Sequence, residues 1–281
     1  MGQYNEHPGD WLSFLKRDGN NKLNILEAKS KYYKEQLLYE NFVSSIIQQQ
    51  QVLANRNQFA GGVEEVCGLI YTFGDRTELD VGIDLWVNDK PTALTTFGEI
   101  NCWDVSQVTN MSGLFQGKTT FNDDISNWDV SNVTNMDLMF ANATAFNQNI
   151  GTWNVSSVTA MYQMFINATS FNGPINNWNV RSVTDMREMF SFASAFQQPL
   201  NLWELDSLTT ATLFMGITGG AGAITYTLLD TLLNGWVVDF AALQSNVTIS
   251  FGDSTFTSAG LAARNILVND KGWTITDGGQ V

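Results

Sequence analysis

Tryptophan recurs at a fixed interval through the middle of this 281-residue chain. Five tryptophans each follow the last by 25 residues: Trp103, Trp128, Trp153, Trp178 and Trp203. A large apolar residue at constant spacing is typical of a solenoid, in which each repeat buries its apolar face only against its neighbours. We therefore expect a repeat array from Trp103 to about Met215, with the rest of the chain capping or extending it.

Each repeat combines two apolar patterns. In Trp128-Asp129-Val130 apolar and polar residues alternate, which predicts a short strand with Trp128 and Val130 facing inward. The following segment, DLMFANA at 137–143, predicts a helical turn. Stacking should align the inward residues into ladders, one of methionines (Met111, Met136, Met161, Met186) and one of phenylalanines (Phe121, Phe146, Phe171, Phe196). The expected fold class is an α/β solenoid: a right-handed leucine-rich-repeat-like coil with short strands and helical turns, capped at both ends and preceded by a long N-terminal helix.

The long helix is predicted between residues 23 and 56, where apolar residues recur every seven positions from Ile25 to Leu53. Ala28 and Phe42 add apolar residues at the intervening positions. Polar residues at Glu35 and Gln49 interrupt the companion row, which argues against a strict coiled coil. A helix of this length needs something to pack against, either another copy, a larger assembly or its own repeat domain. The assembly residues are Ile25, Tyr32, Tyr39, Phe42, Ile46 and Leu53.

The chain is thus divided into four parts. They are an anchoring or assembly segment (1–58), an N-terminal cap (59–102), the repeats (103–215) and a C-terminal cap (216–281). In the first cap, residues 77–88 predict a helix capped by Thr77 and ended by Lys90-Pro91. In the second cap, residues 227–233 and 258–268 predict helices, and residues 247–251 and 273–276 predict strands.

The charge distribution excludes some partners. Lys and Arg number 14 against 28 Asp and Glu, so the net charge is −14. Residues 1–58 hold seven basic and six acidic residues, so the remainder carries 7 − 22 = −15. Such a body should repel nucleic acid. The chain shows neither a signal peptide nor a membrane-length apolar run, which predicts no membrane insertion and no export by the general secretory route.

Catalysis is not expected. The one histidine, His7, lies in the N-terminal tail, and no G-x-S-x-G nucleophile motif occurs. The adjacent acids Asp123 and Asp124 are interpreted as solvated charge. A weak calcium site there, or along the row of Asp104 and Asp129, is the alternative hypothesis, although no calcium-loop pattern is present. No other cofactor or metal is expected. For Cys67 and Cys102, two separate buried thiols are favoured over a bridge.

A candidate ligand face is formed by the polar residues on either side of each inward tryptophan. Short polar side chains in such rows can bind glycans or peptides along one face of a solenoid. The favoured alternative is structural: Asp and Asn cap turns and bond to each other between coils. The face comprises Asp104, Asn127, Asp129, Thr152, Asn154, Asn177 and Asn179, with Cys102 before it and Leu202 and Glu204 at its end.

The repeat also resembles a known family. WDVSNVTNM followed by MF, A and FN resembles the BspA-like leucine-rich-repeat surface proteins, and the resemblance covers about residues 73–279. DLWVNDKPTALTTFGEINCWDVS is similar to the family's lead-in, and GWTITDGG to its closing unit. The resemblance implies the solenoid fold and an adhesive role at a cell surface, for which export would normally be required.

These observations favour a non-enzymatic virion protein, of the kind that decorates a bacteriophage surface or forms a fibre. Residues 1–58 would bind other virion proteins or further copies of the chain, giving a homo-oligomer. The repeats would face outward and contact a host-surface protein or glycan. The alternatives are a bacterial cell-surface adhesin with leucine-rich repeats and a cytosolic protein-interaction scaffold.

Overall fold

The computed structural model describes residue 67, residues 70–215 and residues 226–281. The chain divides into two units, 1–65 and 66–281, and every described residue belongs to the second. The proposed assembly segment, with its six apolar residues from Ile25 to Leu53, therefore lies outside the described residues.

Two short helices precede the repeats. Helix α2 spans Arg76–Asn88 and helix α3 spans Lys90–Phe97, followed by the 3-10 helix η2 at Ile100–Cys102. Asp75, rather than Thr77, caps α2, because its side chain accepts a hydrogen bond from the Glu78 N–H. Helix α2 ends at Asn88, just before Lys90-Pro91 as predicted. These two residues also begin α3, since proline is well tolerated in the first turn.

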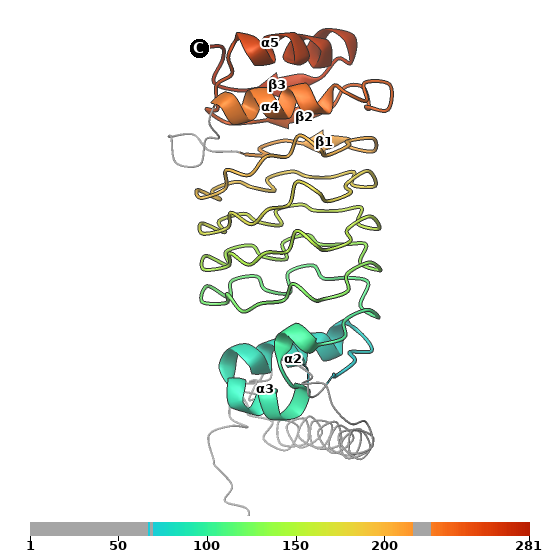
Figure 1. Cartoon of the computed structure of the whole chain (residues 1–281), viewed down its shortest axis with the longest axis vertical. Helices are drawn as coiled ribbons and strands as arrows, with labels where there is room; N and C mark the ends of the chain where they lie inside the picture. The colour runs from blue at the N-terminus through green and yellow to red at the C-terminus, as the bar shows by residue number, and fades with distance from the viewer. Residues whose placement is uncertain (1–66, 68–69, 216–225) are drawn as a thin grey trace, which may run out of the picture. The chain divides into compact units, whose positions relative to one another are not determined.

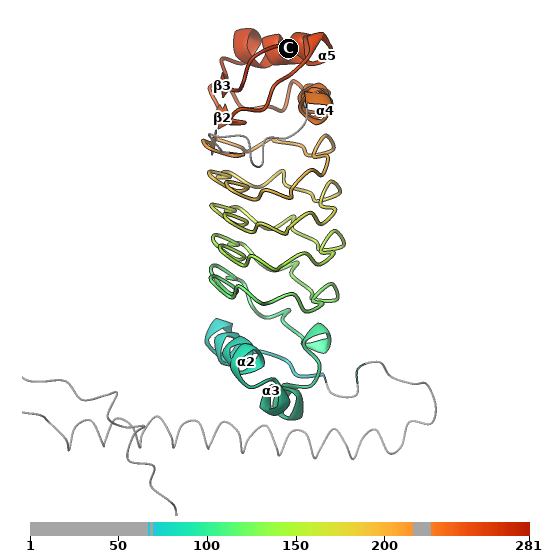
Figure 2. The ribbon, with the colours of Figure 1, turned by 90° about the vertical axis from the view of Figure 1, so that its left-hand side faces the viewer.

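The repeats form coils of chain stacked one upon another between α3 and α4 (Figures 1 and 2). Parallel bridges join equivalent residues of successive coils, 25 residues apart: Asn110 with Asn135, Asn135 with Ala160, Ala160 with Asp185, and Asp185 with Thr210. One sequence repeat is therefore one coil. A leucine-rich-repeat-like solenoid remains our proposal for the fold class.

The pairing between coils does not lie where the alternating pattern placed it. Residues 128–130 contain no β-bridge. Asn135, five residues after Val130, is bridged to the coil before it and to the coil after it. The Asp129 carboxylate accepts a hydrogen bond from the Ser131 N–H at 3.0 Å, and this local bond turns the chain directly after the tryptophan. The expected strand is thus wrong at this position, although its inward residues are buried.

The expected helical turn is also wrong. In residues 137–143 alternate N–H groups reach the next coil, as when Leu138 and Phe140 donate to the carbonyls of Tyr162 and Met164. The backbone takes positive φ at Leu138 and Asn142, both 59°, a conformation that L-residues rarely adopt. The apolar spacing resembled that of a helix, but a helix would have kept these N–H groups within one coil. Bonding between coils therefore decides this backbone.

The core is a set of stacked side-chain ladders. Phe115, Phe140, Phe165 and Phe190 lie with ring centroids 5.3, 5.5 and 5.6 Å apart and planes within 6°. Each inward tryptophan from the second repeat onward donates its indole N–H to a carbonyl 28 residues earlier, as Trp178 does to Ile150 at 3.0 Å. All members of the predicted methionine and phenylalanine ladders are buried.

The C-terminal cap continues the stack. Strands β1 (Thr210–Ala211), β2 (Thr248–Ser250) and β3 (Thr274–Thr276) form a parallel sheet in that order. Helix α4 spans Tyr226–Trp236, and helix α5 (Ser258–Asn265) continues into the π-helix η3 (Ile266–Asp270). The helices and strands expected in this cap are confirmed with shifted bounds. Trp236 donates to the Leu200 carbonyl at 3.0 Å, so it extends the tryptophan ladder although it breaks the 25-residue spacing.

Candidate functional site

The polar residues on either side of the tryptophans lie at the surface. Asn127, Thr152 and Asn177 precede the tryptophans, Asp129, Asn154 and Asn179 follow them, and all six are exposed. Asp104 is partly buried. Because neighbouring strands of a parallel ladder lie about 4.8 Å apart, equivalent side chains should form rows with nearly that repeat. The structure thus gathers the expected residues on one face, but that face is not a hydrogen-bonded sheet.

The row that follows the tryptophans has a structural role. Asp104, Asp129, Asn154 and Asn179 each accept a hydrogen bond through Oδ1 from the N–H two residues later, at 3.0 to 3.3 Å. Within the described part of the chain, Asp129 and Asn154 have no further side-chain hydrogen bond. One atom of each of these two side chains thus shapes the turn, and the other polar atom has no hydrogen-bond partner among the described residues.

Asp104 differs from the rest of its row. Thr72 Oγ1 donates to its Oδ2 at 3.0 Å, and the Ser106 N–H donates to its Oδ1. Burial opposes ionisation of Asp104, but the hydrogen bonds from the Ser106 side chain, the Ser106 N–H and Thr72 together outweigh it and lower the pKa of the carboxyl. Asp104 therefore holds the segment around Thr72 against the first repeat and is the least available member of the face.

Members of the row that precedes the tryptophans are hydrogen-bonded to the preceding coil. The Asn127 N–H donates to Asn101 Oδ1 at 3.0 Å, and the Leu202 N–H donates to Asn176 Oδ1 at 3.1 Å. Thr152 donates through Oγ1 to the Ser126 carbonyl at 3.3 Å. The coils are thus tied together beside the face, and the exposed amide of Asn127 stands on a backbone that is hydrogen-bonded to the preceding coil.

A second polar cluster lies on the turn segments. Asp137, Tyr162 and Arg187 occupy equivalent positions in three successive coils. The Tyr162 N–H donates to Asp137 Oδ1 at 2.7 Å, and the Arg187 guanidinium lies 5.0 Å from the Tyr162 ring centroid while pairing with Asp185 at 2.6 Å. Burial raises the pKa of Asp137. A comparison of equivalent repeat positions would have found these residues. The first and fifth repeats carry the small residues Ser112 and Thr212 at the position that holds larger side chains in the other three repeats.

The acids proposed as a weak calcium site hold the N-terminal cap. Asp123 accepts from Lys90 Nζ at 2.6 Å and from Trp86 Nε1 at 3.0 Å, and Asp124 accepts from Asn101 Nδ2 at 3.0 Å. Across residues 67, 70–215 and 226–281, no group of three or more His, Cys, Asp or Glu could hold a metal ion. The calcium site stays a prediction, and its proposed ligands have structural partners.

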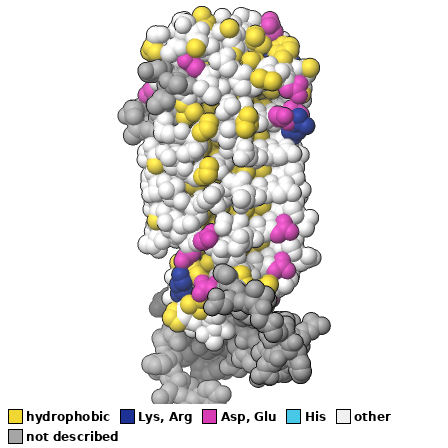
Figure 3. Space-filling view, viewed as in Figure 1, with side chains coloured by type: hydrophobic (Ala, Val, Ile, Leu, Met, Phe, Trp, Pro, Cys, Tyr) yellow, Lys and Arg dark blue, Asp and Glu magenta, His cyan; other side chains and the backbone are white. Residues whose placement is uncertain are grey.

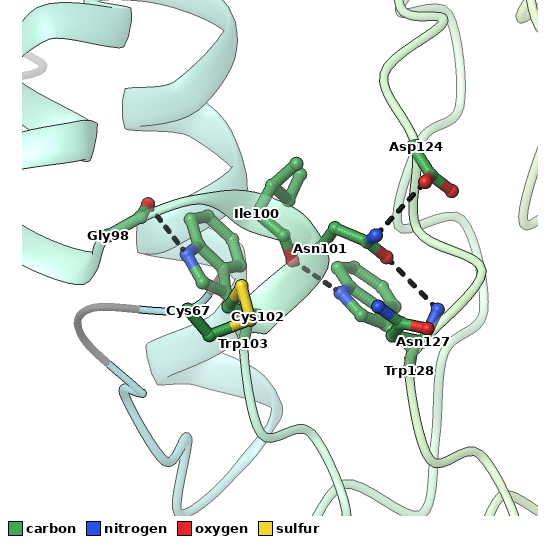
Figure 4. The surroundings of a disulfide bond; sticks show 9 residues. All are labelled: Cys67, Gly98, Ile100, Asn101, Cys102, Trp103, Asp124, Asn127 and Trp128. Carbon is green, nitrogen blue, oxygen red and sulfur yellow. Dashed lines mark hydrogen bonds between the residues drawn. A yellow bond between two sulfur atoms is a disulfide. The ribbon is translucent and has the colours of Figure 1, made fainter. Parts of the chain in front are cut away.

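Cys67 and Cys102 form a disulfide, with Cα atoms 5.6 Å apart (Figure 4). The preference for two separate thiols is therefore wrong. The Phe73 N–H donates a hydrogen bond to the Asp104 carbonyl at 2.9 Å. This bond holds the segment at Phe73 beside the residues that follow η2. Cys102 has no sulfur counterpart in later repeats, so the repeat pattern carried no signal for the bridge.

Figure 4 also shows how the first repeat attaches to the cap beside this disulfide. Trp103 donates to the Gly98 carbonyl at 3.2 Å, and Trp128 donates to the Ile100 carbonyl at 2.7 Å. Covalent and hydrogen-bonded links thus converge on η2.

No helix among the described residues is long and apolar enough to cross a membrane.

The repeat region matches a described protein family. Residues 87–203 match a family described as "Mycoplasma protein of unknown function, DUF285". The match covers the end of α2, α3 and the first repeats, and it supports a relation to the BspA-like surface-repeat proteins that the sequence resembles. No curated protein and no solved structure matches the chain.

Proposed function

We propose that this chain is a non-enzymatic adhesion protein whose stacked repeats present the rows of Asp129, Asn154 and Asn179 to an external ligand. The observation that carries the proposal is that only one polar atom of each of these side chains is used in the turn. One oxygen fixes the turn, while the rest of the polar group is exposed in consecutive coils. Groups ordered before binding lose little entropy when they bind. A glycan or an extended peptide, with polar groups at short regular intervals, suits such a surface.

The disulfide indicates in which cellular compartment the protein functions. Disulfides persist in oxidising environments and are rare in the cytosol. The Cys67–Cys102 bridge therefore favours an extracellular position, and together with the family match it supports a bacterial cell-surface adhesin over a cytosolic scaffold. We place the proposed adhesin on the cell surface.

A virion surface remains the second proposal. The seven-residue apolar recurrence in residues 23–56 favours an assembly segment, which a virion decoration or fibre would need. In that case the same repeats would contact the host. Mass spectrometry of purified virions from the source host, compared with its isolated cell envelopes, separates the two locations. Absence from every virion preparation would end the virion proposal.

Binding is tested with variants that keep the turn and change the ligand-facing atom. Asn154→Asp and Asn179→Asp retain Oδ1 as the turn acceptor but replace an amide donor with a carboxylate oxygen. The full chain is screened on a printed panel of glycans and immobilised peptides. We expect both variants to lose capture of any ligand found, at an unchanged melting temperature.

The matched control is Thr159→Ser, an exposed position in the same coil as Asn154 that keeps its hydroxyl bond to Thr134. It should bind like the parent chain. Equal capture by the parent and by both Asn variants would show that the face does not carry binding. A fall in melting temperature without a change in capture would assign these side chains to structure alone.

A further inference from the structure

A small cavity opens where the fifth repeat meets α4. Its volume is about 170 Å³, and a cavity of roughly 150 Å³ holds one benzene molecule, so this space suits one side chain. Its apolar walls include Trp203, Leu205, Trp236 and Leu243. Figure 3 shows hydrophobic side chains gathered toward this C-terminal end of the repeats on the face in view.

The cavity walls are fixed in place. The indole N–H groups of Trp203 and Trp236 donate to the carbonyls of Ile175 and Leu200 at 2.9 and 3.0 Å. Gly235 lines the cavity, and a Cβ atom there would collide with the Asn201 carbonyl oxygen. Glycine thus allows α4 to approach the fifth repeat closely while the two indoles hold the space open.

Three carboxylates line the same cavity: Glu204, Asp206 and Asp239. Arg181, from the preceding coil, pairs with Glu204 and lies 3.4 Å from Asp206. Asp239 is exposed and has no ion-pair partner among the described residues. The other neighbouring cation, Lys271, donates to the Leu243 carbonyl at 2.7 Å. The balance is negative, and Asp239 is the carboxylate open to an incoming charge.

Two of the apolar side chains that line the cavity are exposed to solvent. Val238 is 85% exposed and Leu202 59%. Exposed apolar groups gathered around a pocket are typical of a protein contact. A free polyamine would leave these side chains in water, whereas a protein surface would cover them.

We infer that this cavity binds a lysine side chain of a partner protein. The aliphatic stem lies against the walls of Trp203 and Trp236, and the ammonium group meets Asp239 at the rim, as long basic side chains commonly bury their stems and keep their charge near water. The cavity includes Leu202 and Glu204, at the end of the polar rows, but it lies three coils from Asp129 and two from Asn154. It does not depend on the adhesive function proposed above.

The test titrates the full chain with n-pentylammonium and with the neutral n-pentanol, following the indole N–H signals of Trp203 and Trp236 by nuclear magnetic resonance. We expect saturable shifts with the cation and weaker binding of the alcohol. Asp239→Asn should weaken cation binding about two- to fivefold, the range that one exposed ion pair contributes. Val238→Lys, which places a positive charge at the mouth, should weaken it as well.

Glu99→Gln is the matched control, because it removes one exposed negative charge from the N-terminal cap, outside both the cavity and the polar rows. It should bind n-pentylammonium like the parent chain, whatever it does to capture on the glycan and peptide panel. Equal affinity for cation and alcohol, no effect of Asp239→Asn, or no binding at all would overturn the inference. Spermidine binding more tightly than an extended peptide with one central lysine would overturn the assignment to a protein partner.

Discussion

Replacing Trp178 with phenylalanine removes one hydrogen bond from the middle of the tryptophan ladder and leaves an aromatic ring in its place. Trp178 is 2% exposed, and its indole N–H donates to the Ile150 carbonyl at 3.0 Å. That carbonyl also accepts from the Trp153 N–H at 3.1 Å, so it keeps one partner in the variant. The lost bond should therefore contribute its net value, about 0.5–1.5 kcal/mol, and not the larger penalty of an orphaned carbonyl.

The smaller ring also leaves space in the core. Truncating a buried Phe or Trp to Ala costs about 3–5 kcal/mol, and Trp to Phe removes a minor part of that volume, so about 1–2 kcal/mol is expected. The sum is about 1.5–3.5 kcal/mol of unfolding free energy. In a unit of roughly 150–250 residues, 1 kcal/mol shifts the melting temperature by about 2–4 °C. We therefore expect a fall of about 3–14 °C.

Thermal unfolding followed by circular dichroism and urea unfolding followed by tryptophan fluorescence measure the change. Asn177→Ala is the control, because Asn177 is exposed and directly precedes Trp178, and a surface change of this kind should stay within about 0.5 kcal/mol. A Trp178→Phe chain whose melting temperature equals that of the parent would refute the view that the ladder is a tightly packed, hydrogen-bonded core.

Three further predictions follow from the disulfide, the backbone and one partly buried acid. The bridge closes a separation of 35 residues, so Cys67→Ser should cost roughly 3–4 kcal/mol; reductant should lower the melting temperature of the parent chain but not of the variant. Gly117 has a φ of 72°, and no atom lies within 4 Å of the point that a Cβ would occupy, so Gly117→Ala should cost about 1 kcal/mol through backbone strain alone. Gly117→Asn should be better tolerated, because Asn142 and Asn167 adopt positive φ at equivalent positions; equal melting of both variants would contradict this. Burial raises the folded-state pKa of Asp137 above its unfolded value, so its ionisation costs stability above the folded pKa and that cost disappears as the pH falls below the unfolded pKa. Asp137→Asn should therefore raise the melting temperature at neutral pH and not in acid, and a lower value at neutral pH would show that the charge is favourable.

Much of the architecture follows from residue spacing. The 25-residue recurrence predicts the length of one coil, and the inward tryptophans, methionines and phenylalanines are buried as expected. The helices and strands of the C-terminal cap were also predictable, because their apolar periodicity and turn residues are local. The polar rows were predictable for the same reason: residues next to a buried tryptophan in an extended segment must face away from it.

The stacking of coils decided what the spacing could not. Alternate N–H groups in residues 137–143 bond to the next coil, so the turn takes positive φ where apolar spacing alone predicted a helix. Trp236 joins the ladder 33 residues after Trp203 through its bond to Leu200, although no fixed period marks it.

The disulfide and the cavity depend on the tertiary structure in the same way. Each brings together residues whose spacing follows no repeat: Cys67 with Cys102, and the fifth repeat with Trp236 and Asp239 of the cap. By itself the sequence determined the coil length and the inward and outward residues, because side-chain burial follows local periodicity. Only the tertiary structure decided which backbone groups pair between coils and where the stack leaves a cavity, because both depend on atoms that meet after the coils have stacked.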